Sequence, residues 1–357
     1  MIEYLIWFSM LSLSCRTKLH LIKEYKTPEN LWNNIHNFNT LNKRLYNKLK
    51  DSWNDNFILE IQKKIVKDNI KLVSYNDSLY PNKLRLYEDA PSVLFYKGDI
   101  NMLNEKLSVS IVGSRNCTTY GINAANIVSA ELSKIKVNVI SGMAKGIDTY
   151  AHTSCINNNG YTCAVLGSGL DIVYPKENKK LFDKISSVGC VISEFLPGTE
   201  PFAYNFPVRN RIISELSDIV IIIEAGIKSG SLITATFALE NGIDVMAVPG
   251  SIFSEQSKGC NKLIKDGAYP LTSMEDVFQL LNIEVNIKLN KNENSVKSGI
   301  ESKIYNTLTD SPLHIDDIIR ITNVDINYLY EVLFELQLQN EIMCLAGNYY
   351  VKNMRNF

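Results

Sequence analysis

The stretch Val109-Ser-Ile-Val-Gly-Ser-Arg115 decides the fold, because a short run of mostly apolar, β-branched residues ends there in a glycine and a serine. Such a run is typical of a buried strand that leads into a turn. Segments with helical spacing, such as Ala124–Lys134, separate most of the later runs of this kind. These runs are Val137–Ser141, Thr162–Gly167, Val188–Ser193, Ile219–Ile223 and Asp244–Val248. Apolar strands that alternate with helices predict an α/β fold, a doubly wound parallel sheet with helices on both faces.

The regions on either side of this α/β segment have a different pattern. Before it, apolar residues recur at helical spacing, as at Ile58, Ile61 and Ile65, and a short extended appendage follows. After it, a Lys/Asn-rich stretch precedes three helical segments and a hairpin with a turn at Gly347-Asn348, a pattern typical of a winged helix. We therefore predict four segments: a small helical domain at 1–69, the α/β domain with its N-terminal extension at 70–281, a linker at 282–299 and a winged-helix domain at 300–357.

The composition excludes several classes of protein. The 357 residues carry a net charge of −1, so any affinity for nucleic acid must come from a local patch. Residues 300–357 are acidic, with 4 Lys and Arg against 8 Asp and Glu. The 7 Cys contain no Cys-x-x-Cys pair and the 4 His do not cluster, which disfavours disulfide frameworks and zinc sites. Because Glu3 stands in place of a positive n-region and the apolar start is too short to cross a bilayer, we predict a cytoplasmic protein without a membrane segment.

Small and polar residues follow every predicted strand. The carboxyl ends of parallel strands share one edge of a sheet, where ligands bind in folds of this class. Glycine and serine let a ligand approach the backbone closely and leave helix N-terminal N–H groups free for an anion. The strand ends are Gly113-Ser114-Arg115, Gly142 to Gly146, Gly167-Ser-Gly169, Ser193-Glu194, Glu224-Ala-Gly226 with Ser229-Gly230-Ser231, and Pro249-Gly250. Together they predict an anion-binding site on that edge.

The same strand ends disfavour the familiar nucleotide enzymes. The first turn is not Gly-x-Gly-x-x-Gly and no acidic residue ends the second strand, so a nicotinamide cofactor is disfavoured. A Gly-x-x-x-x-Gly-Lys-Ser/Thr loop is missing as well. His152 is the single histidine of the α/β segment, so no Ser–His or Cys–His dyad can be argued. Four carboxylates could form a catalytic set or, alternatively, cap helices and hold basic residues: Asp148, Asp171, Glu194 and Glu224.

Four basic residues belong to the predicted edge: Arg115, Lys145, Arg209 and Arg211. Guanidinium groups beside helix N-termini suit a polyanion, but a structural ion pair remains open for each arginine and solvated surface for Lys145. Arg211 lies four residues before Glu215 and can pair with it. With Pro207 at a first helical position, Arg209 and Arg211 lie about 200° apart on a helix and do not face one groove together. Three aromatic residues of the edge could stack on bases: Tyr120, Tyr204 and Phe206.

The ordered motifs resemble those of the DNA-processing protein A (DprA/Smf) family. The resemblance is dense over about 107–270. Its motifs are Ile111-Val-Gly-Ser-Arg115, Ser141-Gly-Met-Ala-Lys-Gly-Ile-Asp148, Gly167-Ser-Gly-Leu-Asp171 with Tyr174-Pro175, Phe206-Pro-Val-Arg-Asn-Arg-Ile-Ile213, Ser229-Gly-Ser-Leu-Ile-Thr-Ala235 and Val248-Pro-Gly250.

The resemblance implies an extended Rossmann-like domain that binds single-stranded DNA, protects it and helps load a RecA-type recombinase in natural transformation and recombination. It implies a homodimer through that domain, and no enzymatic turnover, cofactor or metal. The candidate DNA-binding residues are Gly113, Ser114, Arg115, Gly142, Lys145, Gly146, Phe206, Arg209, Asn210, Arg211, Ser229, Gly230 and Ser231.

Two other functions remain open at this point. A related Rossmann-like fold occurs in nucleotide-binding and nucleotide-hydrolysing enzymes, although Ser229-Gly-Ser-Leu-Ile-Thr supplies no glutamate of the kind those enzymes use. A structural adaptor built on the winged helix is the other alternative. The expected recognition helix, Asp325–Gln339, carries Asp325, Glu331 and Glu335 and no Lys or Arg, which favours a protein partner over duplex DNA.

Overall fold

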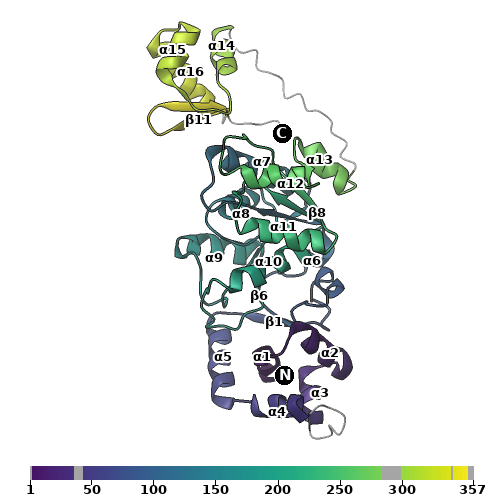
Figure 1. Ribbon diagram of the computed structural model, residues 1–357. Helices are drawn as coiled ribbons and strands as arrows, with labels where there is room; N and C mark the ends of the chain where they lie inside the picture. The colour runs from purple at the N-terminus through teal and green to yellow at the C-terminus, as the bar shows by residue number, and fades with distance from the viewer. Residues whose placement is uncertain (1, 36–42, 284–298, 339–340, 353–357) are drawn as a thin grey trace. The chain divides into compact units, whose positions relative to one another are not determined.

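The computed structural model describes residues 2–35, 43–283, 299–338 and 341–352. The chain divides into two compact units, 1–272 and 273–357. Figure 1 shows the helices and strands of both units. Nearly all of the predicted linker at 282–299 lies outside the described residues, so the four-segment division of the chain stays a prediction.

The first unit is built on a nine-stranded sheet with the order β1-β2-β6-β5-β4-β3-β7-β8-β9. The strands β3 through β9 are parallel to one another. Strand β2 pairs antiparallel with β6, and β1 pairs antiparallel with β2. The strands are β1 (Lys71–Ser74), β2 (Val93–Gly98), β3 (Ser108–Val112), β4 (Asn138–Ser141), β5 (Thr162–Val165), β6 (Cys190–Ser193), β7 (Ile219–Ile222), β8 (Asp244–Ala247) and β9 (Tyr269–Pro270).

The six predicted strands correspond to β3 through β8, so the doubly wound parallel sheet is confirmed. Every residue of β3, β4, β5, β6 and β7 is buried, as continuous apolar runs predict. The segment expected to pack as an appendage instead adds β1 and β2 to one edge of the sheet. Strand β9, which the sequence pattern did not predict, extends the other edge.

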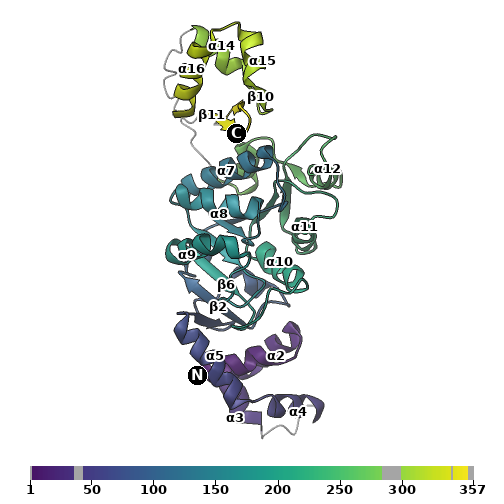
Figure 2. The same ribbon diagram turned by 90° about the vertical axis from the view of Figure 1, so that its left-hand side faces the viewer.

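Helices cover both faces of the sheet. Figure 2 shows α7, α8 and α9 on one face and α10, α11 and α12 on the other. Local signals start some of them: the Thr118 side chain accepts a hydrogen bond from the Gly121 N–H and caps α7. The helices are α6 (Met102–Glu105), α7 (Thr119–Lys134), α8 (Ile147–Asn157), α9 (Lys179–Val188), α10 (Asn205–Glu215), α11 (Ser231–Glu240) and α12 (Lys258–Lys265), with short 3₁₀ helices η2 (Lys83–Leu86) and η3 (Lys176–Asn178).

The N-terminal region is helical, as its sequence spacing predicts. Side chains of Ser14, Thr27 and Asn54 cap three of its helices by accepting backbone N–H groups. Trp7 and Phe8 are fully buried in an apolar core that continues into the core of the sheet. These helices are α1 (Ile2–Met10), α2 (Cys15–Tyr25), α3 (Pro28–Asn34), α4 (Lys43–Asp51) and α5 (Asp55–Lys67).

The second unit contains the predicted winged helix. A three-stranded sheet with the order β10-β12-β11 packs with helices around buried Ile304, Leu329 and Leu333. Gly347 and Asn348 both have positive φ, which makes the predicted hairpin turn. Its elements are α13 (Met274–Leu280), α14 (Gly299–Thr307), β10 (Leu313–His314), α15 (Ile315–Thr322), α16 (Ile326–Leu338), β11 (Ile342–Leu345) and β12 (Tyr349–Lys352).

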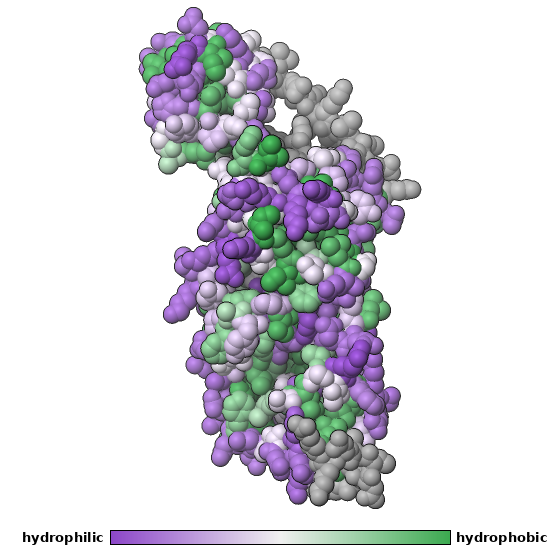
Figure 3. Space-filling view, viewed as in Figure 1, coloured by the Kyte–Doolittle hydropathy of each residue, from purple (hydrophilic) through white to green (hydrophobic). Residues whose placement is uncertain are grey.

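The surface seen in Figure 3 mixes hydrophobic patches with hydrophilic residues over the helices of both units. In the part of the chain that the structure describes, no helix is both long enough and apolar enough to cross a bilayer.

Candidate nucleic-acid interface

The sheet changes direction of winding between β3 and β7, and a groove opens at that point. The helices that follow these two strands, α7 and α11, lie on opposite faces, so their loops part at the carboxyl edge. The groove has a volume of about 720 Å³. Most predicted site residues line it: Gly113, Ser114, Arg115, Phe206, Arg209, Asn210, Ser229, Gly230 and Ser231.

The turn after β3 is held tightly against its neighbours. The Ser114 N–H donates to the Glu224 carbonyl at 2.7 Å, and the Ser114 hydroxyl donates to Gln256 Oε1 at 2.9 Å. A Cβ on Gly113 would come within 2.7 Å of Ile147 Cγ1, and one on Gly146, whose φ is +78°, would come within 2.3 Å of the Ser114 carbonyl oxygen. Glycine and serine therefore serve here chiefly to close the turn, which presents the next residue to the groove.

Arg115 is that next residue, and its side chain is exposed. Its guanidinium lies over the Phe206 ring, 5.5 Å from the centroid. Among the described residues, no carboxylate pairs with Arg115 and no acceptor takes a hydrogen bond from its guanidinium. A guanidinium offers five N–H donors in a planar fork, so Arg115 presents hydrogen-bond donors to the groove that no described acceptor takes.

Arg209 contacts the same Phe206 ring, at 5.8 Å from the centroid, but it is only 4% exposed. One terminal nitrogen, Nη1, donates to the carbonyl oxygen of Gly142 at 2.5 Å and to that of Val165. Burial lowers the pKa of Arg209 to about 10, against the opposing effect of nearby Asp148. The side chain stays charged at neutral pH, and it ties the ends of β4 and β5 to α10 instead of offering its donors to a ligand.

Gly142 and Lys145 lie in the loop after β4, and neither is placed as a ligand-binding residue of the groove lining. A Cβ on Gly142 would lie 2.3 Å from Arg209 Nη1, so the glycine makes room for the arginine. Lys145 lies outside the groove lining and donates to Glu177 Oε1 at 2.7 Å. This exposed pair raises the pKa of Lys145 and lowers that of Glu177. A solvated pair of this kind exchanges readily for another anion.

Arg211 is placed away from the groove, because it lies two residues after Arg209 on α10. Its guanidinium is buried against Glu194 at 2.5 Å, Glu215 at 3.6 Å and Asp89 at 3.7 Å. The pairing with Glu215 confirms the structural alternative. The expected contact between Arg211 and DNA has no support in this geometry, since three carboxylates already surround the guanidinium. Arg211 therefore holds β6 and α10 together.

The remaining lining comes from the start of α11 and from aromatic residues. Ser229, Gly230 and Ser231 form the turn where α11 begins, and the Ser229 and Ser231 hydroxyls lie 2.8 Å apart. The positive end of the helix dipole thus faces the groove. Tyr174 packs on Phe206 with ring centroids 5.6 Å apart. Tyr174 and Lys228 also line the groove and were not among the predicted site residues.

The carboxylates are engaged in holding loops. Asp148 accepts hydrogen bonds from the N–H groups of Gly142 and Ala144, at 3.1 and 3.3 Å. Glu224 accepts from the Thr118 N–H at 2.7 Å and the Thr118 hydroxyl at 2.6 Å. These contacts favour the capping alternative over a catalytic set.

The single histidine of the α/β segment is also structural. His152 is buried beside Thr162, and burial lowers its pKa to about 3. Within the described ranges no cluster of His, Cys, Asp or Glu has the arrangement of a metal site.

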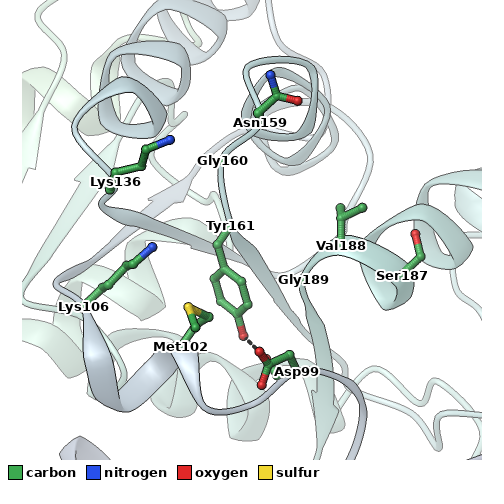
Figure 4. Close-up of a pocket in the computed structure, with 10 residues that line it drawn as sticks. All are labelled: Asp99, Met102, Lys106, Lys136, Asn159, Gly160, Tyr161, Ser187, Val188 and Gly189. Atoms are coloured by element: carbon green, nitrogen blue, oxygen red, sulfur yellow. Dashed lines mark hydrogen bonds between the residues drawn. The ribbon is translucent and has the colours of Figure 1, made fainter.

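A second hollow of about 460 Å³ opens at the opposite edge of the sheet, where Lys106 and Lys136 lie near Tyr161 (Figure 4). The Tyr161 hydroxyl donates to the Asp99 carbonyl oxygen at 2.5 Å. Helices α7, α8 and α9 all end at this edge, and their negative dipole ends disfavour an anion there. The second hollow therefore has two lysines beside these helix C-termini, whereas the groove at the carboxyl edge has Arg115 together with the N-terminus of α11.

The fold and the groove define a Rossmann-like α/β protein that has an exposed arginine and a helix N-terminus at its switch point and lacks a dinucleotide fingerprint. Residues 71–282 match the family model described as DNA recombination-mediator protein A, and residues 293–348 match the DprA winged helix domain. The chain belongs to the DprA family, as the motifs predicted.

Similar proteins agree with this assignment. The chain is 47% identical over 202 residues to the DNA processing protein DprA of Streptococcus pneumoniae, which covers 57% of this chain and 71% of the relative. An X-ray structure of that DprA superposes with a TM-score of 0.68 at 36% identity, covering 78% of this chain and 98% of the other. A structure of Helicobacter pylori DprA, described in terms of its single-stranded DNA binding mode, superposes with a TM-score of 0.55 at 28% identity, covering 60% and 95%.

Proposed function

We propose that this protein binds single-stranded DNA in the groove at the carboxyl edge of its sheet. Arg115 carries the proposal, because its exposed guanidinium has no hydrogen-bond or ion-pair partner among the described residues, and it lies over Phe206 at the groove. Phosphates would bind Arg115 and the positive end of α11, and bases would pack on Phe206 and Tyr174. The single-stranded DNA binding described for the H. pylori relative supports this ligand.

The wider role proposed is that of a DNA-processing protein in natural transformation and recombination. We propose that it protects incoming single strands and helps load a RecA-type recombinase in the cytoplasm, without turnover of its own. Membership of the DprA family supports this role. The hydrogen bonds that occupy Asp148 and Glu224 favour a binding protein over the nucleotide-hydrolysing alternative.

A homodimer through the α/β domain is part of the proposal. Strand β9 is the edge of the sheet, and Tyr269 in it is 48% exposed. Exposed apolar residues occur elsewhere in the domain, with Leu239 55% exposed and Phe253 89% exposed. Light scattering after size exclusion tests the dimer, and a mass of 40.4 kDa at micromolar concentration would contradict it.

For the winged helix we propose a protein partner. Along α16, exposed Ile326, Tyr330 and Phe334 form an apolar stripe at spacings of four residues, beside Glu331 and Glu335. Carboxylates on a recognition helix repel duplex phosphates, whereas an apolar stripe with an acidic border suits a basic protein surface.

The experiment that tests DNA binding is fluorescence anisotropy with matched single- and double-stranded oligonucleotides across a salt series. Arg115→Ala should weaken single-strand binding at least about tenfold, because a charge-assisted contact contributes about 1.5–3 kcal/mol. Lys106→Ala, at the opposite edge of the sheet, is the matched control and should bind like the wild type. Unchanged affinity in a folded Arg115→Ala variant would reject the proposal.

A further inference from the structure

The loop between β6 and α10 carries a pair of exposed aromatic rings beside the groove. Phe202 is 49% exposed and Tyr204 is 68% exposed. Their rings are stacked, with centroids 5.4 Å apart and an angle of 11° between the planes. Their neighbours Pro201 and Ala203 line the groove, so the pair stands at its rim. We call Phe202 and Tyr204 the aromatic ledge.

The ledge is held in place by its own backbone. The Phe202 N–H donates to the Glu200 carbonyl at 2.8 Å, and the Asn205 N–H donates to the Phe202 carbonyl at 3.0 Å. The Asn205 side chain donates to the Glu200 carbonyl at 3.1 Å. Further down the loop, the Gly198 N–H donates to Asp171 Oδ1 at 2.8 Å. A loop with these bonds keeps the two rings ordered before any ligand arrives, which lowers the entropic cost of binding.

The chemistry of the loop selects bases over phosphates. Between residues 195 and 208 the single charged side chain is that of Glu200, and the segment contains no Lys or Arg. The segment itself therefore offers a phosphate a carboxylate and no cation. A nucleobase needs only a flat face, and stacking on an aromatic ring accepts any base.

The ledge continues the base-contacting side of the groove. Tyr174 and Phe206 pack on each other within the groove, and Phe206 lies two residues after Tyr204 in the chain. We propose that Phe202 and Tyr204 form a second base-stacking subsite, which takes one or two nucleotides that leave the groove and so lengthens the strand covered by the protein. This inference rests on the proposed function of the groove.

The test compares oligothymidylates of increasing length, from about 6 to about 30 nucleotides, on full-length wild type and the double variant Phe202→Ala/Tyr204→Ala. Oligomers that fill only the groove should bind both proteins equally. Longer oligomers should bind the wild type at least about fivefold more tightly than the variant, since one stacked base contributes about 1–3 kcal/mol. Conservative replacement by Phe202→Tyr/Tyr204→Phe should keep the length advantage.

Two additional measurements distinguish base stacking from a contact with the sugar-phosphate backbone. An oligonucleotide with abasic sites where the strand leaves the groove should cancel the wild-type advantage. The fluorescence of a Tyr204→Trp variant should be quenched by long oligomers but not by short ones. Thermal melting checks that the alanine variant is folded, which its exposed positions predict.

Each outcome has one meaning. If the double variant and the wild type bind oligomers of every length with equal affinity, the proposal that the aromatic ledge stacks on bases is wrong. The same holds for a variant that binds every length normally but no longer loads a recombinase, because the pair would then be a protein contact. Wild type that binds no single strand, or an Arg115→Ala variant that binds like wild type, counts against the groove itself.

Discussion

The two arginines that contact the Phe206 ring should respond differently to alanine substitution, one in stability and the other in DNA affinity. Arg209 donates to two buried backbone carbonyls, those of Gly142 and Val165, and its positive charge opposes the rise in pKa that burial causes at Asp148. Hydrogen bonds from a charged donor contribute about 1.5–3 kcal/mol each, and an uncompensated buried carboxylate adds to the loss. Arg209→Ala should therefore lower the free energy of unfolding by about 3–5 kcal/mol, a large part of a typical total of about 5–15 kcal/mol.

Arg115 offers the matched control, because its guanidinium also lies over the Phe206 ring. It is exposed and makes no hydrogen bond or ion pair within the described residues, so Arg115→Ala should lower the free energy of unfolding by no more than about 1 kcal/mol, the contribution of its contact with Phe206. The assay is urea unfolding followed by circular dichroism, with oligonucleotide anisotropy on the same samples. Arg209→Lys should also be destabilised, because an ammonium loses the Nε donation to Asn210 Oδ1 at 3.1 Å and the flat face that lies over Phe206.

An exchange of these effects between the two arginines would refute the roles assigned to them. A stable Arg209→Ala variant that loses only DNA affinity would mean that Arg209 turns outward and contacts phosphate. An Arg115→Ala variant whose free energy of unfolding falls by several kcal/mol would mean that Arg115 has a structural partner.

Three further predictions concern other parts of the chain. Lys145→Ala should weaken single-strand binding less than Arg115→Ala, because Lys145 lies outside the groove lining and its ammonium already pairs with Glu177; an equal loss in the same anisotropy assay would contradict this. Burial raises the pKa of Glu215 to about 8 in the folded protein, so the folded state binds more protons than the unfolded state and stability should fall as pH rises from about 5 to 8. Glu215→Gln should flatten that decline in pH-dependent unfolding, and an unchanged slope would count against it. The wild type should bind duplex DNA weakly. The double variant Glu331→Lys/Glu335→Lys on α16 should bind duplex more tightly in an electrophoretic shift assay, and no gain in affinity would mean that α16 does not contact duplex DNA.

The positions of the strand ends could be predicted from sequence because they depend on local pattern. Apolar runs followed by small or polar residues located β3 through β8, and topology then brought their loops to one edge. The helical phase of α10 was also readable in part, since it separated Arg209 from Arg211. Which of the two faced the groove was open, because it depends on how α10 packs against the sheet.

The burial of individual side chains could not be predicted from local sequence pattern. The helix α10 begins at Asn205, two residues before the predicted start at Pro207. Arg209 has the residue type of a phosphate ligand but points at carbonyls from strands far away in sequence. Tyr174 and Lys228 were missed because each lies in a loop whose path is set by tertiary packing. The Tyr174-Pro175 pair after the third strand was the signal that could have found the first of them.

Helix α10 links the groove to the N-terminal helices, because its opposite faces contact different parts of the first unit. One face carries Phe206 and Arg209 to the groove. The other carries Arg211 into the buried carboxylate cluster, where its Nη2 also lies 3.9 Å from Cys15 Sγ of the N-terminal helix α2. A shift of α10 that weakened the groove would also separate buried charges, which is costly. The N-terminal helices therefore help to fix the position of Phe206, whose ring contacts Arg115, although these helices contribute no residue to the groove lining.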